Sequence, residues 1–262
     1  MSGDGTAVYL YGVTRDLDPA ALDGVTGVDA APVRAVTAAG LTALVSTARL
    51  DRYGEQALRA NLEDLRFLED TARAHHDVVG LAARNAPTAP VRIATLYRDD
   101  DRVRQVLTRQ RAHFTRVLDG ITGRTEWGVK AYAHPPQATQ EPERGPGGGG
   151  AGTAYLRRRQ DQRRRRERAA RHLAGLAEGL HAELAGRAVA ARHHPPQDPR
   201  LSGRQGTLVL NAAYLVDDDH AHRFVESART AADHLEGIEV EVTGPWPPYS
   251  FITAHDGTED GA

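Results

Sequence analysis

Near its end the chain carries the stretch Thr243-Gly244-Pro245-Trp246-Pro247-Pro248-Tyr249-Ser250-Phe251, with three prolines and three aromatic residues in nine positions. Proline fixes φ and removes a backbone donor, so we expect this stretch to end the strand-like run 238–242 before it. The prediction is an extended, polyproline-like strap over residues 243–252. A stiff strap loses little entropy on docking, and its rings offer large faces for burial. Two interpretations follow: the strap closes the core of its own chain, or it docks a partner.

The length and composition of the chain indicate two globular domains. Its 262 residues exceed what one hydrophobic core usually fills. Hydrophobic residues make up 40% and charged residues 26%, as in ordinary globular proteins. We predict an N-terminal α+β domain over residues 1–122 and a C-terminal domain over residues 123–262.

The N-terminal part alternates strand and helix patterns. Apolar, β-branched runs at 7–13, 33–36, 41–45 and 90–97 predict strands. Leucines at three- and four-residue steps predict one amphipathic helix over residues 55–85, and a second helix is expected over 99–120. Strands and helices mixed in this way indicate the α+β class.

The C-terminal part follows a different order. Strands are expected at 125–132, 188–192, 207–216 and 238–242, with a long helix at 153–187 and another helix at 217–237. This β-α-β-β-α-β order is typical of a ferredoxin-like sheet. The Gly/Pro-rich tract at 134–152 is expected to be a flexible insertion, since it cannot build a core.

Four motifs in the same order along the chain carry a family resemblance. They are 8–13 (VYLYGV), 126–130 (EWGVK), 211–216 (NAAYLV) and 243–251 (TGPWPPYSF). Together they resemble the gas vesicle protein F/L family, although that family often has Phe-Gly where this chain has Ile93-Ala94. The resemblance implies an α+β N-terminal domain and a ferredoxin-like C-terminal domain with added helical structure. It also implies an accessory role in gas vesicle assembly, by binding the small hydrophobic shell protein or other gas vesicle proteins during nucleation or growth.

The strongest local charge lies in the first half of the long predicted helix. Its centre is the run Arg163, Arg164, Arg165 and Arg166. Three interpretations stay open: a solvated helix face, a nucleic-acid site, or a surface for an acidic protein. Nucleic acid is not favoured, because no aromatic residues interleave for base stacking and the whole chain has a formal net charge of -2.

No catalytic constellation stands out in the sequence. The chain has no cysteine, and its His75-His76 and His193-His194 pairs lack a metal-binding pattern, so surface or half-buried histidines are expected. The glycine tract lacks the Gly-Lys-Ser/Thr ending of a phosphate loop, and no Gly-x-Ser-x-Gly elbow occurs. We therefore expect no enzyme activity, no metal and no cofactor. The alternative is a nucleic-acid- or nucleotide-binding protein that uses the ferredoxin-like domain and the arginine-rich helix.

The expected location is the cytoplasm, in association with the gas vesicle. No run approaches the ~18 apolar residues of a membrane helix, and no signal peptide pattern opens the chain. We expect the aromatic strap to cover apolar surface of a shell subunit and the arginines to steer acidic partners. The candidate partner-binding residues are Trp246, Pro247, Pro248, Tyr249 and Phe251 in the strap, and Arg163, Arg164, Arg165 and Arg166 in the helix.

Overall fold

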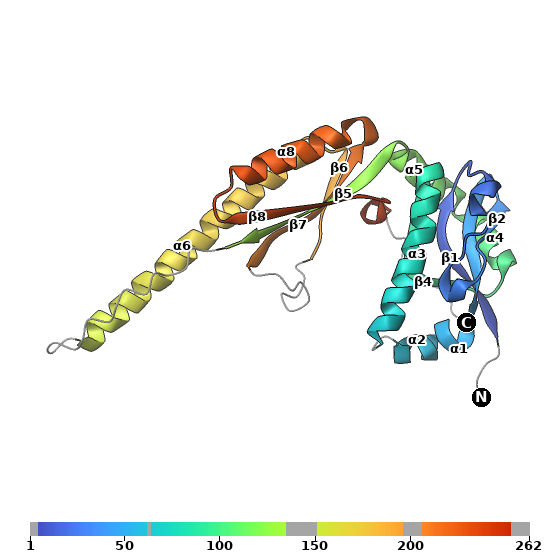
Figure 1. Cartoon of the computed structure of the whole chain (residues 1–262), viewed down its shortest axis with the longest axis horizontal. Coiled ribbons are helices and arrows are strands. Elements are labelled where there is room, and N and C mark those ends of the chain that lie inside the picture. The colour runs from blue at the N-terminus through green and yellow to red at the C-terminus, as the bar shows by residue number, and fades with distance from the viewer. Residues whose placement is uncertain (1–4, 62–63, 135–150, 196–205, 253–262) are drawn as a thin grey trace. The chain divides into compact units, whose positions relative to one another are not determined.

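The computed structural model describes residues 5–61, 64–134, 151–195 and 206–252 and divides the chain into two compact units. The first unit comprises Met1–Glu126 together with Pro245–Ala262, and the second comprises Trp127–Gly244. Each unit contains one sheet of four strands among the described residues (Figure 1). This partition differs from the predicted domains 1–122 and 123–262, because the end of the chain belongs to the first unit.

The first sheet is antiparallel, with the strand order β2-β3-β1-β4. The four strands predicted from apolar, β-branched runs are confirmed. Ala39 and Gly40 form the turn of the predicted hairpin, and both have positive φ, 55° and 77°, as a two-residue turn of this hand requires. The strands are β1 (Thr6–Thr14), β2 (Arg34–Ala38), β3 (Leu41–Arg49) and β4 (Thr88–Tyr97).

The helices of the first unit are shorter than predicted. The single helix expected over 55–85 is wrong, because Asp64 caps a new helix by accepting hydrogen bonds from the N–H groups of Arg66 and Phe67. The helix expected over 99–120 also breaks, at Gln110 (φ −100°, ψ 16°). The elements are η1 (Pro19–Leu22), η2 (Val28–Ala30), α1 (Leu50–Tyr53), α2 (Glu55–Asn61), α3 (Leu65–Asn85), α4 (Asp100–Arg109), α5 (Arg111–Ile121) and η4 (Tyr249–Phe251).

The first sheet is buried on both faces. Leu10 in β1 packs with Leu107 of α4 and Leu118 of α5 in one apolar cluster. Tyr9, its neighbour in the strand, points to the other face and packs with Val78 of α3 in a second cluster. Side chains alternate across a strand, so β1 supplies both cores. The C-terminal end of the chain reaches both clusters, as described below.

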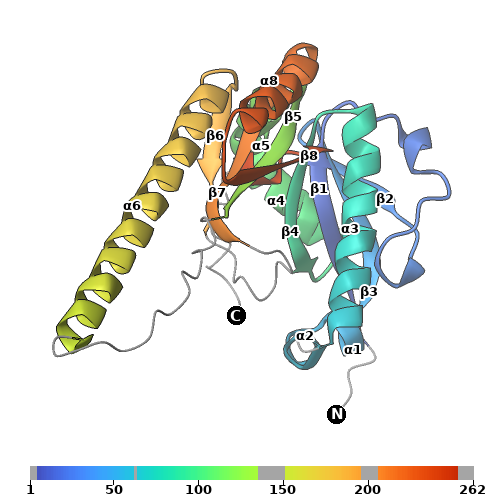
Figure 2. The ribbon, with the colours of Figure 1, turned by 60° about the vertical axis from the view of Figure 1, so that its left-hand side comes forward.

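The second unit has the expected order of elements within the part of the chain that the structure describes. Its sheet runs β6-β7-β5-β8, and α6 and α8 contribute to one apolar cluster with it. The two helices contact each other, and Figure 2 shows them beside the strands of this sheet. Of the predicted insertion 134–152, residues 135–150 lie outside the described residues, and Ala151 begins α6. The elements are β5 (Arg124–Ala133), α6 (Ala151–Ala185), β6 (Ala190–His193), β7 (Thr207–Asp217), η3 (Asp218–His220), α8 (Ala221–Asp233) and β8 (Ile238–Trp246).

The last strand corrects the prediction made for the proline-rich stretch. We expected Pro245 to end the strand before it, yet β8 runs on to Trp246. The physical reason is the place of β8 at the edge of its sheet, because an edge strand tolerates a residue without an N–H group. The end of the predicted strap is also not extended, since Tyr249–Phe251 forms a turn of 3₁₀ helix.

Candidate functional site

Residues 245–252, here called the C-terminal segment, are docked into the first unit. Pro247 and Pro248 are buried, Tyr249 packs against the cluster that contains Tyr9, and Ile252 packs against the cluster of α4 and α5. The segment therefore closes part of the core of its own chain, as the first interpretation expects, and partner docking stays a prediction.

A buried carboxylate holds the segment in place. Glu126, which is 8% exposed, accepts a hydrogen bond from the Ser250 N–H at 2.8 Å and another from the Ser250 hydroxyl at 2.6 Å. Hydrogen bonds to a charged acceptor are stronger than neutral ones. Glu126 lies in the EWGVK motif and Ser250 in the TGPWPPYSF motif, so the contact joins two motifs that are 124 residues apart.

Trp246 differs from the rest of the segment because its side chain remains accessible. The residue is 41% exposed, and its ring meets the ring of His76 edge-on at a centroid distance of 5.3 Å. Phe251 is half-buried. Of the five predicted strap residues, Trp246 offers an accessible ring, while the two prolines and Tyr249 serve the packing of the segment.

The segment covers a buried histidine that sequence reasoning missed. His75 in α3 is 1% exposed, so the expectation of surface or half-buried histidines is wrong at this position. Its Nδ1 lies 3.1 Å from the Tyr9 hydroxyl, which accepts a hydrogen bond from the Ala94 N–H at 2.9 Å. Burial lowers the pKa of His75 to about 4, with the Val91 carbonyl acting in the opposite direction. The ring is therefore neutral at physiological pH and functions as part of the core.

The tyrosines around His75 are also perturbed by burial. Desolvation raises the pKa of Tyr9 and of Tyr249 above the ordinary value for a phenol. The Tyr249 hydroxyl is buried and has no hydrogen-bond partner among the described residues. Helical spacing in α3 places His75 on the same face as apolar residues such as Val79, and this was the available signal for its burial.

A backbone irregularity lies at Ala94, next to this cluster. Pairing between β1 and β4 passes from Leu10 with Thr95 to Gly12 with Pro90, so residues 91–94 bulge from the ladder. Ala94 has a φ of 63°, in the left-handed region that favours glycine. The departure from the family's Phe-Gly at Ile93-Ala94 therefore has a structural consequence, because alanine pays a steric cost in this conformation.

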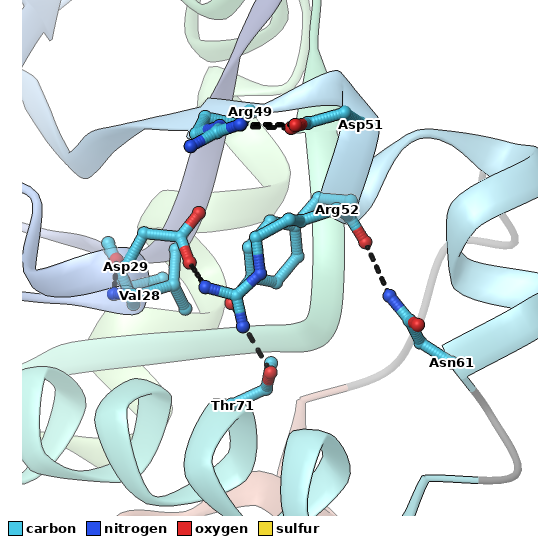
Figure 3. A network of polar contacts seen from close by, with 9 residues as sticks. Val28, Asp29, Arg49, Asp51, Arg52, Asn61 and Thr71 are labelled. Carbon is cyan, nitrogen blue, oxygen red and sulfur yellow. Dashed lines mark hydrogen bonds and ion pairs between the residues drawn. The ribbon is translucent and has the colours of Figure 1, made fainter. Parts of the chain in front are cut away.

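A second polar network ties the loop before β2 to the helices of the first unit (Figure 3). Arg52 pairs with Asp29, and the Asn61 side chain donates to the Arg52 carbonyl at 3.2 Å. The Arg52 guanidinium also lies over the Phe67 ring, 5.5 Å from its centroid. The network connects α1, α2 and α3 to the loop and has a structural explanation.

The arginine-rich half of α6 makes no such contacts with the core of its unit. From Tyr155 to His172, the side chains that the structure describes are exposed, apart from a half-buried Ala169, and burial begins at Leu173. Arg163, Arg164, Arg165 and Arg166 all lie in this part, and Arg163 pairs with Glu167 one turn along. The predicted site residues in the C-terminal segment and those in α6 thus belong to different units.

The described residues contain no group of three or more His, Asp or Glu side chains that could hold a metal ion. Within the same residues, no helix is long and apolar enough to cross a membrane.

Comparison with known proteins shows similarity to gas vesicle proteins over almost the whole chain. A family model described as gas vesicle synthesis protein GvpL/GvpF matches residues 7–253. The chain is 42% identical over 249 residues to gas vesicle protein L of Streptomyces sp. (strain CB03234), covering 93% of this chain and 91% of the relative. It is 26% identical over 262 residues to gas vesicle protein F of the same strain, covering 94% and 99%.

Solved structures agree on the fold. The crystal structure of GvpF from Anabaena sp. PCC7120 superposes with a TM-score of 0.69 at 17% sequence identity, covering 95% of this chain and 99% of that one. GvpF from Microcystis aeruginosa gives a TM-score of 0.66 at 18% identity, with the same coverage. At such low identity the likeness shows a shared mixed α/β architecture.

Proposed function

We propose, because this chain belongs to the gas vesicle synthesis protein GvpL/GvpF family, that it binds other gas vesicle proteins while a vesicle is nucleated or grows. Membership of the family implies a role in gas vesicle assembly. The observation that carries the proposal is the family match over residues 7–253, supported by 42% identity to a gas vesicle protein L. Direct binding of partners is proposed for two surfaces, the exposed ring of Trp246 and the basic half of α6.

The proposed principal partner is the small hydrophobic shell protein. A shell subunit exposes apolar surface before it assembles, and a rigid aromatic face can cover that surface transiently. The exposed ring of Trp246 supplies this face. Pro247, Pro248, Tyr249 and Phe251 hold Trp246 in position, since they anchor the segment to the first unit.

The proposed role of the basic helix is steering. Arg163, Arg164, Arg165 and Arg166 are exposed on a helix whose first half has no buried side chain among those described. Clustered positive charge raises the association rate with acidic partners more than it raises the affinity.

We further infer that the second unit is a ferredoxin-like domain. Support comes from its strand order β6-β7-β5-β8, with a helix between β5 and β6 and another between β7 and β8.

A substitution at Trp246 tests the shell-protein surface. Trp246→Ser in the full chain should weaken binding of purified shell protein by about tenfold or more, the loss expected at an aromatic hot spot. Tyr155→Ser removes another exposed aromatic ring, 60% exposed on α6, and serves as the matched control. Equal affinity of the two variants, with unchanged circular dichroism, would remove Trp246 from the site.

A charge reversal tests the steering role. Replacing Arg163, Arg164, Arg165 and Arg166 by Glu should slow association with an acidic gas vesicle protein at low salt and leave dissociation nearly unchanged. Stopped-flow measurement at several salt concentrations checks this. An association rate that is the same for both proteins at low salt would contradict steering.

A further inference from the structure

A groove in the second unit lies between α6 and α8 and has a volume of about 800 Å³. Its floor is apolar, with Leu176 from α6, Ala231 from α8 and Leu235 just after the end of α8, all half-buried. Its rim carries exposed charges, including Arg187 just after the end of α6 and Glu226 from α8. An apolar floor with a charged rim is the form in which proteins bind an amphipathic helix.

The chain leaves room in this groove that its own packing does not use. Gly175 and Gly179 line the groove, and a Cβ added at either position meets no atom within 4 Å. Glycine inside a helix costs about 1 kcal/mol relative to alanine. Neither the fold of α6 nor its contact with α8 therefore explains this cost, and a closely approaching partner would use the space.

The side of α6 that lines the groove continues into the basic half of the helix. His172 and Arg168 precede Gly179 by seven and eleven residues, and Arg165 precedes Leu176 by eleven, so these side chains share the groove's side of the helix. Nine arginines and two acidic residues lie between Tyr155 and His172. One end of the surface is thus apolar and the other strongly positive.

We propose that this surface binds an amphipathic helix of a protein partner, apolar where it lies over Leu176 and Leu235 and acidic where it passes Arg165 and Arg168. Charge complementarity selects this occupant: the arginines require an anionic partner, and the groove requires an apolar one. Nucleic acid satisfies only the first requirement. The span from Arg165 to Leu180 is about 22 Å of helix, so the partner helix needs about 15 to 20 residues.

This inference deepens the proposed function. It rests on that function in one respect, that the partner is a gas vesicle protein. The test therefore uses designed peptides, so that the surface can fail while the shell-protein experiment succeeds, and the reverse. One peptide of about 20 residues has leucines at helical spacing in its first half and glutamates along the same stripe in its second half. A second peptide replaces every glutamate by lysine.

Fluorescence anisotropy of the labelled peptides with the full chain measures the affinity. Saturable binding of the glutamate peptide is expected, about tenfold tighter than binding of the lysine peptide at low salt. Absence of saturable binding, or equal affinity for the two peptides, would overturn the proposal.

Variants of the chain locate the binding. Gly179→Trp fills the groove and should weaken binding of the glutamate peptide by about tenfold or more, whereas Gly179→Ala takes up a smaller part of the space and should weaken it by about twofold to threefold. The double variant Arg165→Glu with Arg168→Glu should weaken the peptide by about tenfold. Its matched control reverses Arg159 and Arg163, which lie four residues apart on the side of α6 away from the groove-lining residues, and should change the affinity by less than about threefold.

The control pair keeps the test decisive if Gly179→Trp fails to fold, because both pairs change the net charge equally. Equal effects of the two pairs would mean nonspecific attraction and would overturn the proposal. A dimer of the chain that Gly179→Trp abolishes would identify a second copy as the occupant instead. Competition by an RNA oligonucleotide as effective as the glutamate peptide would also refute a protein helix as the ligand.

Discussion

The C-terminal segment and the basic half of α6 were both predicted as partner surfaces, and the fold treats them in opposite ways. The segment is docked on its own unit: two prolines are buried, Tyr249 packs on a core cluster, and Ser250 is held by Glu126. The basic half of α6 buries none of its described side chains before Leu173.

The difference follows from what each surface costs to leave exposed. Apolar rings gain free energy wherever they are removed from water, so a fold that can reach them covers them itself. Four consecutive arginines would lose hydration on burial, and no set of carboxylates in the second unit's core is available among the described residues to repay that loss. Charge therefore stays at the surface, where a partner can meet it.

The largest expected effect concerns the packing of the C-terminal segment on the first unit. Tyr249→Ala should lower the free energy of unfolding of the first unit by about 3 to 4 kcal/mol, since it removes a ring packed on the core. Urea denaturation followed by circular dichroism measures this. Tyr249→Phe is the matched control and should be neutral or stabilising by about 1 kcal/mol, because the buried hydroxyl it removes has no partner among the described residues.

The second effect concerns the histidine under the segment. In the unfolded chain His75 titrates near its ordinary value of 6.5, whereas in the fold its pKa is about 4. Between these values the unfolded state binds more protons, so stability falls as the pH is lowered from 6.5 to 4, by about 3 kcal/mol in total.

Urea midpoints measured from pH 7 to pH 4 check the contribution of His75. His75→Gln should flatten this part of the pH dependence, while His76→Gln, at the neighbouring position, serves as the control. A wild-type slope that survives in His75→Gln would assign the acid sensitivity to other groups.

A smaller effect is expected at the bulge in β4. Ala94→Gly should stabilise the first unit by about 1 kcal/mol, because glycine adopts the φ of 63° without the steric cost that alanine pays. Thermal unfolding measures the gain. Ala39→Gly, at another position with positive φ in the β2–β3 turn, tests whether the gain depends on the conformation alone. A destabilised Ala94→Gly would refute the interpretation.

The smallest effect concerns the exposed arginines in the basic half of α6. Replacing Arg163, Arg164, Arg165 and Arg166 by Ala should change the free energy of unfolding by less than about 0.5 kcal/mol, since these side chains are exposed. Loss of the exposed Arg163–Glu167 pair contributes little. A loss of several kcal/mol would show that the basic half of α6 supports the fold.

Much of the fold was predictable because it depends on local patterns. Short apolar, β-branched runs located all four strands of the first sheet, and the Ala39-Gly40 turn located its hairpin. The breaks at Asp64 and Gln110 were missed because apolar residues at helical spacing lie on both sides of each break, and only the local backbone shows the interruption. The burial of His75 was missed for a related reason, since a histidine on an apolar helix face is compatible with either environment until its neighbours are known.

The candidate site was also predictable in part. The positions of the arginines and their exposure on a helix were readable from composition, because no core can absorb that charge. Closure of the chain's own core was one of two interpretations that the sequence offered for the C-terminal segment. The contact that fixes the segment was not predictable, because Glu126 and Ser250 are 124 residues apart and nothing in either motif indicates that they meet.

By itself, then, the sequence determined the family, the order of strands and helices, and the placing of positive charge, all of which follow from residue type and short-range spacing. Only the tertiary structure decided that β8 continues through Pro245, that the segment after it closes the first unit's core, and that α6 and α8 leave a groove between them. Those features depend on contacts between residues that are far apart in the sequence. Because hydrophobic burial is not directional, the sequence does not show which of these distant surfaces pack together.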